Sequence, residues 1–104
     1  MDRIERIKDF LKNSPDDSFL NHALALEYIK LGNDSEARIL FETILSHNPN
    51  YIGSYYHLAK LLERSGENQQ ALQCYEKGIE EAIKAGDQHA LNELRAAYED
   101  LVDL

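Results

Sequence analysis

A unit of thirty-four residues occurs twice between Ser18 and Ala85, and this repetition most constrains what the chain can fold into. Positions one period apart carry the same or a similar residue. The matched pairs are Gly32 and Gly66, Ala37 and Ala71, Leu24-Ala25 and Leu58-Ala59, Glu42 and Glu76, Phe41 and Tyr75, and Leu45 and Ile79. Repetition at a period of this size is the signature of stacked-repeat architectures, in which each unit buries its apolar face against its neighbours.

The order of residue types within each unit is also specific. The first unit reads Asn21-x-x-Leu24-Ala25-x-x-Tyr28, then Ala37-x-x-x-Phe41 and Pro49, and the second reads Tyr55-x-x-Leu58-Ala59-x-x-Leu62, then Ala71-x-x-x-Tyr75. This pattern resembles that of the tetratricopeptide repeat family. The resemblance implies an all-α fold in which antiparallel helix-turn-helix repeats stack as a short right-handed superhelix, an α-solenoid, of about six helices. It also implies a scaffold that binds other proteins.

The repeat and its interruptions predict the organisation of the chain. With 104 residues, the chain has the size of one compact domain. The predicted parts are an N-terminal half-repeat helix at 1–13, repeat 1 at 18–51, repeat 2 at 52–85 and a C-terminal capping helix at 87–104. Two repeats with a helix at each end reach the size of about three units that such arrays usually need.

Helix boundaries follow from breakers and caps. Pro15 ends the first helix, and Asp17 or Ser18 can cap the next by accepting bonds from free backbone amides. The predicted repeat helices are 19–31, a helix from Asn33 or Asp34 to about His47, 52–65 and 68–85. Ile83 stands where Pro15 and Pro49 stand one and two periods earlier, so the fourth repeat helix is expected to run on to about residue 85. Gly86 and Asp87 then stop that helix and cap the last one.

Gly78 interrupts a helix interior, where the first unit has Ile44. A glycine there costs about 1 kcal/mol relative to alanine. We therefore expect the next helix to approach closely at this position, and Gly78→Leu to overfill the contact.

Composition excludes several function classes. The chain has a formal net charge of −8 and a pI of about 4.8. An acidic surface repels nucleic-acid phosphates and the anionic face of a membrane, so neither is an expected partner. No apolar run reaches the roughly twenty residues of a membrane span. Cys74 is the only cysteine, which excludes an intramolecular disulfide and favours the reducing cytoplasm.

In each repeat, one edge of the first helix faces its partner helix, and another edge is left uncovered by that partner. The resemblance implies that these first helices line a concave groove that commonly receives an extended peptide or a helix. The predicted groove residues are Phe19, His22, Leu26, Ile29, Tyr56, His57 and Lys60. The segment 19–31 is apolar nearly all round, which a helix with one buried face does not require. The alternative is that this surplus apolar surface packs on the N-terminal helix or on another copy of the protein.

No pattern of catalytic or cofactor chemistry emerges from the sequence. The four histidines include no pair at i,i+4 spacing, and they are His22, His47, His57 and His89. His22 and His57 could approach each other across neighbouring first helices, but a zinc site needs three or four ligands. Cys74 lies far from any helix N-terminus that would lower its pKa. We therefore expect no enzyme, no cofactor and no metal.

The preferred hypothesis is a non-catalytic protein–protein interaction module that binds a peptide or helix in a shallow concave groove. The alternative is a self-associating structural protein, a homodimer formed through the same apolar edge. The sequence predicts neither the identity of the partner nor the choice between a peptide and a helix.

Overall fold

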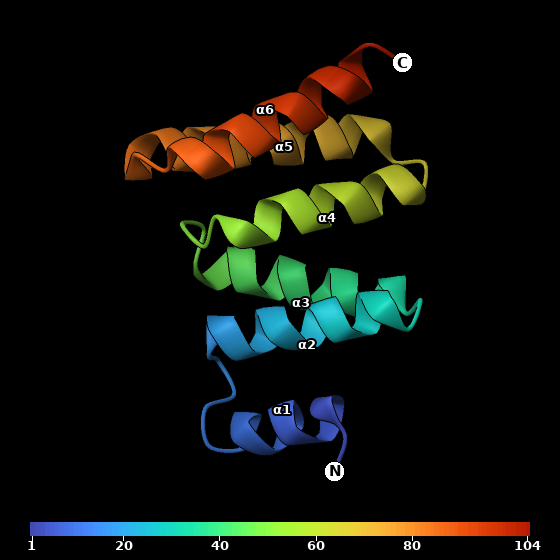
Figure 1. Cartoon of the computed structure of the whole chain (residues 1–104), viewed down its shortest axis with the longest axis vertical. Helices are drawn as coiled ribbons and strands as arrows, with labels where there is room; N and C mark the ends of the chain where they lie inside the picture. The colour runs from blue at the N-terminus through green and yellow to red at the C-terminus, as the bar shows by residue number, and fades with distance from the viewer. The chain divides into compact units, whose positions relative to one another are not determined.

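A computed structural model describes all 104 residues, and it contains six α-helices and no strand (Figure 1). The helices are α1 (Arg3–Leu11), α2 (Ser18–Lys30), α3 (Asp34–His47), α4 (Gly53–Arg64), α5 (Asn68–Ala85) and α6 (Gln88–Val102). The chain divides into two compact units, Met1–Asn48 with α1 to α3 and Pro49–Leu104 with α4 to α6. The predicted all-α helical repeat fold is confirmed, and the predicted helices agree with the observed ones to within two residues at each end.

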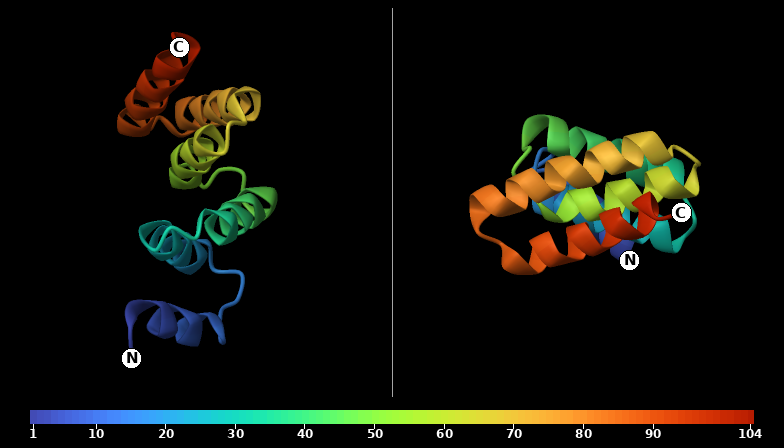
Figure 2. Two further views of the ribbon diagram at one scale, coloured as in Figure 1. Left: turned by 90° about the vertical axis from the view of Figure 1, so that its right-hand side faces the viewer. Right: turned by 90° about the horizontal axis from the view of Figure 1, so that it is seen from above.

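Each repeat folds as a helical hairpin because a glycine closes the turn between its two helices. Gly32 and Gly66 have φ of 79° and 81°, a left-handed conformation that other residues disfavour. The N–H of Asn33 donates to the carbonyl of Tyr28 at 2.8 Å, and the same bond recurs one period later at 2.9 Å. As a result, α2 and α3 run side by side in opposite directions, as do α4 and α5 (Figures 1 and 2).

Aspartates begin three of the helices. The side chains of Asp2, Asp17 and Asp87 accept bonds from the backbone N–H three residues ahead, at 2.8, 2.9 and 3.0 Å. Each bond satisfies one of the amides that a helix start leaves free. The predicted caps at Asp17 and Asp87 are confirmed. So is the longer fourth repeat helix, because α5 has 18 residues where α3 has 14.

Small residues at matched repeat positions let the hairpin helices approach closely. Four alanines at matched repeat positions have no exposed surface, and they are Ala25, Ala37, Ala59 and Ala71. Phe41 and Tyr75, one period apart, are also fully buried and fill the space beside them. The repeated positions therefore form the core of each unit.

Gly78 lies in a close helix contact of the second unit. A Cβ at this position would lie 2.7 Å from the Cβ of Tyr55 on α4 and 3.1 Å from the Cδ1 of Leu94 on α6. The predicted close approach is therefore present, with one difference. The nearest neighbour is on the preceding helix α4, and the following helix α6 is second.

The last helix divides into the two faces that its spacing predicts. Leu91, Leu94, Ala97 and Leu101 are buried, and Tyr98 is half-buried. The polar residues of the other face are all exposed, and they are Asn92, Glu93, Arg95, Glu99, Asp100 and Asp103. None of the six helices combines the length and apolar character of a membrane span.

The first helix buries less than its apolar stripe suggests. Ile7 is its only buried side chain, Ile4 and Leu11 are half-buried, and Phe10 is 64% exposed. Phe10 occupies the repeat position that Gly78 holds in α5. Ile44, at the same repeat position in α3, is buried, whereas the Phe10 ring in α1 lies in solvent.

Candidate binding surfaces

The candidate residues of the first unit lie on α2. Phe19 is 70% exposed, whereas His22, Leu26 and Ile29 are half-buried. The two fully buried residues of α2 are others, so the helix is apolar beyond the side that it buries. This apolar surplus is the feature that the sequence predicted for the segment 19–31.

One of these residues also takes part in the packing of its hairpin. The His22 ring meets the Phe41 ring edge-on, with 5.4 Å between centroids and 65° between planes. This geometry is favourable for aromatic pairs. His22 therefore supports the contact of α2 with α3, while Phe19 remains the most exposed of the α2 candidates.

The candidate residues of the second unit lie on α4, and they contact one another. The Lys60 ammonium lies 5.6 Å from the centre of the Tyr56 ring, which is within the range of a cation–π contact. Lys60 also lies 3.6 Å from a carboxylate oxygen of Glu63. The rings of Tyr56 and His57 are 5.5 Å apart and nearly perpendicular. The structure thus groups Tyr56, His57 and Lys60 on one helix.

A buried tyrosine fixes the carboxylate that faces Lys60. The Tyr75 hydroxyl, in the core between α4 and α5, donates a hydrogen bond to Glu63. Burial, and then the bond to Glu63 and its charge, raise the pKa of Tyr75 well above the ordinary value. Sequence reasoning did not identify this contact. The sequence does contain a signal for it, because Tyr75 and Glu63 stand at the repeat positions where the first unit has Phe41 and Ile29.

The matched positions therefore give the two helical hairpins different chemistry. In the first unit they are apolar or aromatic, and they are His22, Leu26, Ile29 and Phe41. In the second unit they are mostly polar, and they are Tyr56, Lys60, Glu63 and Tyr75. The α2 face can contact apolar groups, whereas the α4 face presents a cation whose position Glu63 and Tyr56 restrict.

The structure disfavours protonation of His57. Burial lowers the pKa of His57 below the ordinary 6.5, and the negative charge of Glu93 on α6 offsets part of this effect. The folded protein therefore holds His57 neutral at pH values where the unfolded chain already protonates it.

We expect acidification to destabilise the protein through His57. Above pH 6.5 the imidazole is neutral in both states, so its effect appears only as the pH falls below that value. From there to the folded-state pKa, the free energy of unfolding falls by at most about 1.4 kcal/mol per pH unit for this one proton. Urea unfolding between pH 7.5 and 5.5 measures it. In His57→Gln this part of the decline is expected to vanish, and an equal decline in both proteins would contradict the assignment.

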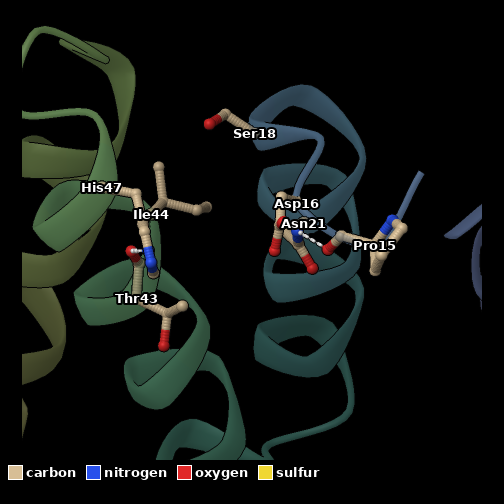
Figure 3. Close-up of a pocket in the computed structure, with 7 residues that line it drawn as sticks. All are labelled: Pro15, Asp16, Ser18, Asn21, Thr43, Ile44 and His47. Carbon is tan, nitrogen blue, oxygen red and sulfur yellow. Dashed lines mark hydrogen bonds between the residues drawn. The ribbon is translucent and has the colours of Figure 1, made fainter.

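The first unit contains cavities at both ends of α2. A cavity of about 80 Å³ separates the start of α2 from the end of α3, and its lining residues are Pro15, Asp16, Ser18, Asn21, Thr43, Ile44 and His47 (Figure 3). Figure 3 shows His47 and Asp16 on opposite sides of this space. The Asn21 amide donates to the Pro15 carbonyl at 3.0 Å, and the His47 ring nitrogen lies 3.0 Å from the Thr43 carbonyl. These polar groups thus have partners within their own helix ends.

A larger cavity lies between the N-terminal end of α1 and the C-terminal end of α2. Its volume is about 320 Å³, and its lining residues are Asp2, Arg3, Ile4, Glu27, Lys30 and Leu31. Nothing in the sequence pattern indicated it.

The remaining reactive groups form no recognisable catalytic arrangement. No group of three or more histidine, cysteine, aspartate or glutamate side chains is placed to hold a metal ion. Cys74 is half-buried, and its thiol donates to the Tyr55 carbonyl at 3.4 Å.

Comparison with known proteins defines the family. Tetratricopeptide repeat models match residues 20–51 and 40–73. The chain is 42% identical to a tetratricopeptide repeat domain protein from Salinibacter ruber, with a TM-score of 0.83, and the match covers 85% of this chain and 98% of that one. The chain belongs to the tetratricopeptide repeat family. Proteins of this family are generally interaction modules rather than enzymes.

Other solved structures share the tetratricopeptide repeat fold. A protein from Bordetella parapertussis is 25% identical, with a TM-score of 0.84 over 99% of this chain and 90% of that one. The TPR2B domain of yeast Sti1, solved in a complex with pHsp70, is 17% identical, with a TM-score of 0.87 over 96% of this chain and 80% of that one. At that identity the likeness shows the fold alone. No curated protein sequence matches the chain.

Proposed function

We propose that this tetratricopeptide repeat protein binds a peptide or helix of a partner protein, without catalysis, on the apolar face of α2 in the first unit, and that the partly exposed face of α4 is the candidate surface of the second unit. The observation that carries the proposal is the apolar surplus of α2. Phe19 is 70% exposed, and Leu26 and Ile29 lie on the same side of the helix, only half-buried. Exposed apolar surface grouped in this way marks interaction sites more often than scattered apolar residues do.

The chemistry of the α2 face and of the α4 face indicates which groups of a partner suit each of them. Apolar side chains suit the α2 face, where their burial is the main source of affinity. A hydrogen-bond acceptor suits the α4 face, where Lys60 is held beside Tyr56 and Glu63. The Sti1 domain in its complex with pHsp70 is an example of this fold bound to a protein partner.

We expect Leu26→Asp to weaken partner binding while the fold survives. A peptide selected from a random displayed library on the wild-type protein serves as the probe, and calorimetry gives its Kd. A charge in the α2 face is expected to raise that Kd by about 30-fold, which corresponds to about 2 kcal/mol. Ile39→Asp is the control, because it places the same charge at an exposed apolar residue on α3, outside the proposed face.

Circular dichroism separates the outcomes of this experiment. Intact helical signal with weakened binding in Leu26→Asp alone supports the proposal. Loss of the helical signal in Leu26→Asp would place Leu26 in the core, and equal weakening in both variants would exclude the α2 face as the site. A wild-type dimer, seen by light scattering as twice 11.9 kDa and split by Leu26→Asp into folded monomers, would make this face a homodimer interface instead.

A further inference from the structure

The smaller cavity of the first unit lies at the open end of its helical hairpin, between the start of α2 and the end of α3 (Figure 3). The Asn48 side-chain amide donates to the Ser18 hydroxyl at 3.3 Å, which ties these two helix ends together. The cavity volume of about 80 Å³ is several times the roughly 10–15 Å³ that one water molecule needs. The cavity is therefore large enough for the end of a side chain.

The hydrogen-bond donors around this cavity are already in use. The Asn21 amide nitrogen donates to two backbone carbonyls, each at 3.0 Å. The Thr43 hydroxyl donates to the carbonyl four residues earlier at 2.8 Å. The Nδ1 atom of His47 lies 3.0 Å from the Thr43 carbonyl, and because a carbonyl only accepts, Nδ1 has the proton. These groups therefore have few protons left for a ligand.

Acceptor oxygens remain available. The side-chain oxygen of Asn21 keeps its lone pairs, because only the amide nitrogen of that residue is engaged. The exposed carboxylate of Asp16 takes part in no hydrogen bond or ion pair within the chain, and Figure 3 places it across the space from His47. The side chains at the cavity thus suit a ligand that donates hydrogen bonds and has a positive charge.

Charge in and around the first hairpin also favours a cation. The Asp17 carboxylate accepts a bond from the Leu20 N–H at 2.9 Å and offsets the positive end of the α2 dipole. The end of α3, on the other side of the cavity, contributes the negative end of its own dipole. The whole chain has a formal net charge of −8, which attracts basic partners and speeds their association.

We propose that this cavity binds the ammonium group of a lysine side chain of a partner protein. The ammonium donates to the Asp16 carboxylate and the Asn21 side-chain oxygen, and the alkyl stem lies against Ile44, the buried residue of the lining. Lysine combines a long apolar stem with a compact charge, which suits a small cavity better than the planar fork of arginine. The lining includes no residue of the apolar α2 face, so the inference does not rest on the proposed function.

A titration followed by nuclear magnetic resonance tests the site on the full chain. The probe is n-butylammonium chloride, which reproduces the stem and the charge of lysine. At constant ionic strength we expect it to shift the side-chain amide signal of Asn21 and the backbone signals of Asp16 and Ser18, with a Kd on the order of 10 mM. Neutral n-butanol is expected to leave these signals in place. Unchanged signals with n-butylammonium would overturn the proposal, and so would equal shifts with n-butanol.

A matched pair of variants separates the site from general charge attraction. Asp16→Asn removes one charge from an exposed position before α2 and is expected to raise the Kd of n-butylammonium about tenfold. Asp100→Asn removes the same charge from an exposed position of α6 and is expected to change that Kd by less than about twofold. Equal weakening in both variants, or none in Asp16→Asn, would overturn the site.

A short peptide decides whether the ammonium belongs to a protein. Acetyl-Gly-Lys-Gly-amide has the lysine side chain as its only cation, and we expect it to shift the same signals as n-butylammonium. The same peptide with norleucine in place of lysine is expected to shift none of them. Binding of the free amine without binding of the lysine peptide would overturn the assignment to a protein partner. Leu26→Asp, which tests the proposed function, is expected to leave n-butylammonium binding unchanged, so the two proposals can fail separately.

Discussion

Replacing Gly78 with leucine is expected to lower the free energy of unfolding by about 3 kcal/mol. Even a Cβ at this position would lie 2.7 Å from the Cβ of Tyr55 and 3.1 Å from the Cδ1 of Leu94. The Cβ of Tyr55 is fixed by its own backbone, so the clash cannot be relieved by rotating a side chain. Leucine has the higher helix propensity, which returns about 1 kcal/mol and leaves the substitution strongly unfavourable.

Urea or thermal unfolding of Gly78→Leu measures this effect. Gln73→Leu is the control, since it adds the same side chain to an exposed position of the same helix and is expected to change stability by less than about 0.5 kcal/mol. Gly78→Ala is expected to fall between the two, because it gains helix propensity but keeps the contact with Tyr55. A thermal midpoint of Gly78→Leu at or above that of the wild type would contradict the close packing.

Helices, turns and core residues could be predicted because they depend on local patterns that the repeat displays twice. Gly32 and Gly66 recur at one period, and both adopt the left-handed conformation that a helix end requires. Gly78 was also informative, because a glycine in a helix interior lowers stability unless a close helix contact compensates for it. The sequence indicated that such a contact exists. It could not tell that α4 is nearer than α6, because that depends on side-chain positions in three dimensions.

The candidate surface was less predictable, because exposure depends on how closely helices pack. The apolar spacing of α1 suggested a buried stripe, yet Phe10 is 64% exposed. Spacing identifies a face, but it does not show whether a ring fits against the neighbouring helix. The Phe19, Leu26 and Ile29 surface stays a prediction, and so does the single-domain organisation of residues 1–104.

The hydrogen bond from Tyr75 to Glu63 can be inferred from the sequence only when the two positions are considered together. A tyrosine in a core and a glutamate on a helix are each unremarkable. At the matched positions of the first repeat, both residues are apolar, namely Phe41 and Ile29. The two changes belong together, because a buried hydroxyl needs a partner and a carboxylate is a strong acceptor.

We therefore expect Tyr75→Phe and Phe41→Tyr to lower the free energy of unfolding by unequal amounts. Tyr75→Phe removes one hydrogen bond, leaves Glu63 paired with Lys60, and is expected to cost about 1 kcal/mol. Phe41→Tyr adds a hydroxyl to a fully buried ring, directed by the repeat geometry toward Ile29, which offers no acceptor. An unpaired buried hydroxyl costs about 1–3 kcal/mol, and the added volume raises the expected loss to about 3 kcal/mol.

A double-mutant cycle tests whether the pair, rather than either residue, is responsible. Because the hydroxyl of Phe41→Tyr lacks an acceptor, adding Ile29→Glu is expected to recover about 1–2 kcal/mol of the lost stability, although Ile29→Glu alone is destabilising. Urea unfolding of the wild type, both single variants and the double variant gives the coupling energy. A coupling energy near zero would mean that a buried hydroxyl at this repeat position does not require a carboxylate on the neighbouring helix. A favourable coupling would show that a buried hydroxyl at this repeat position is stabilised by a carboxylate on the neighbouring helix, and in the second unit that carboxylate is the one beside Lys60.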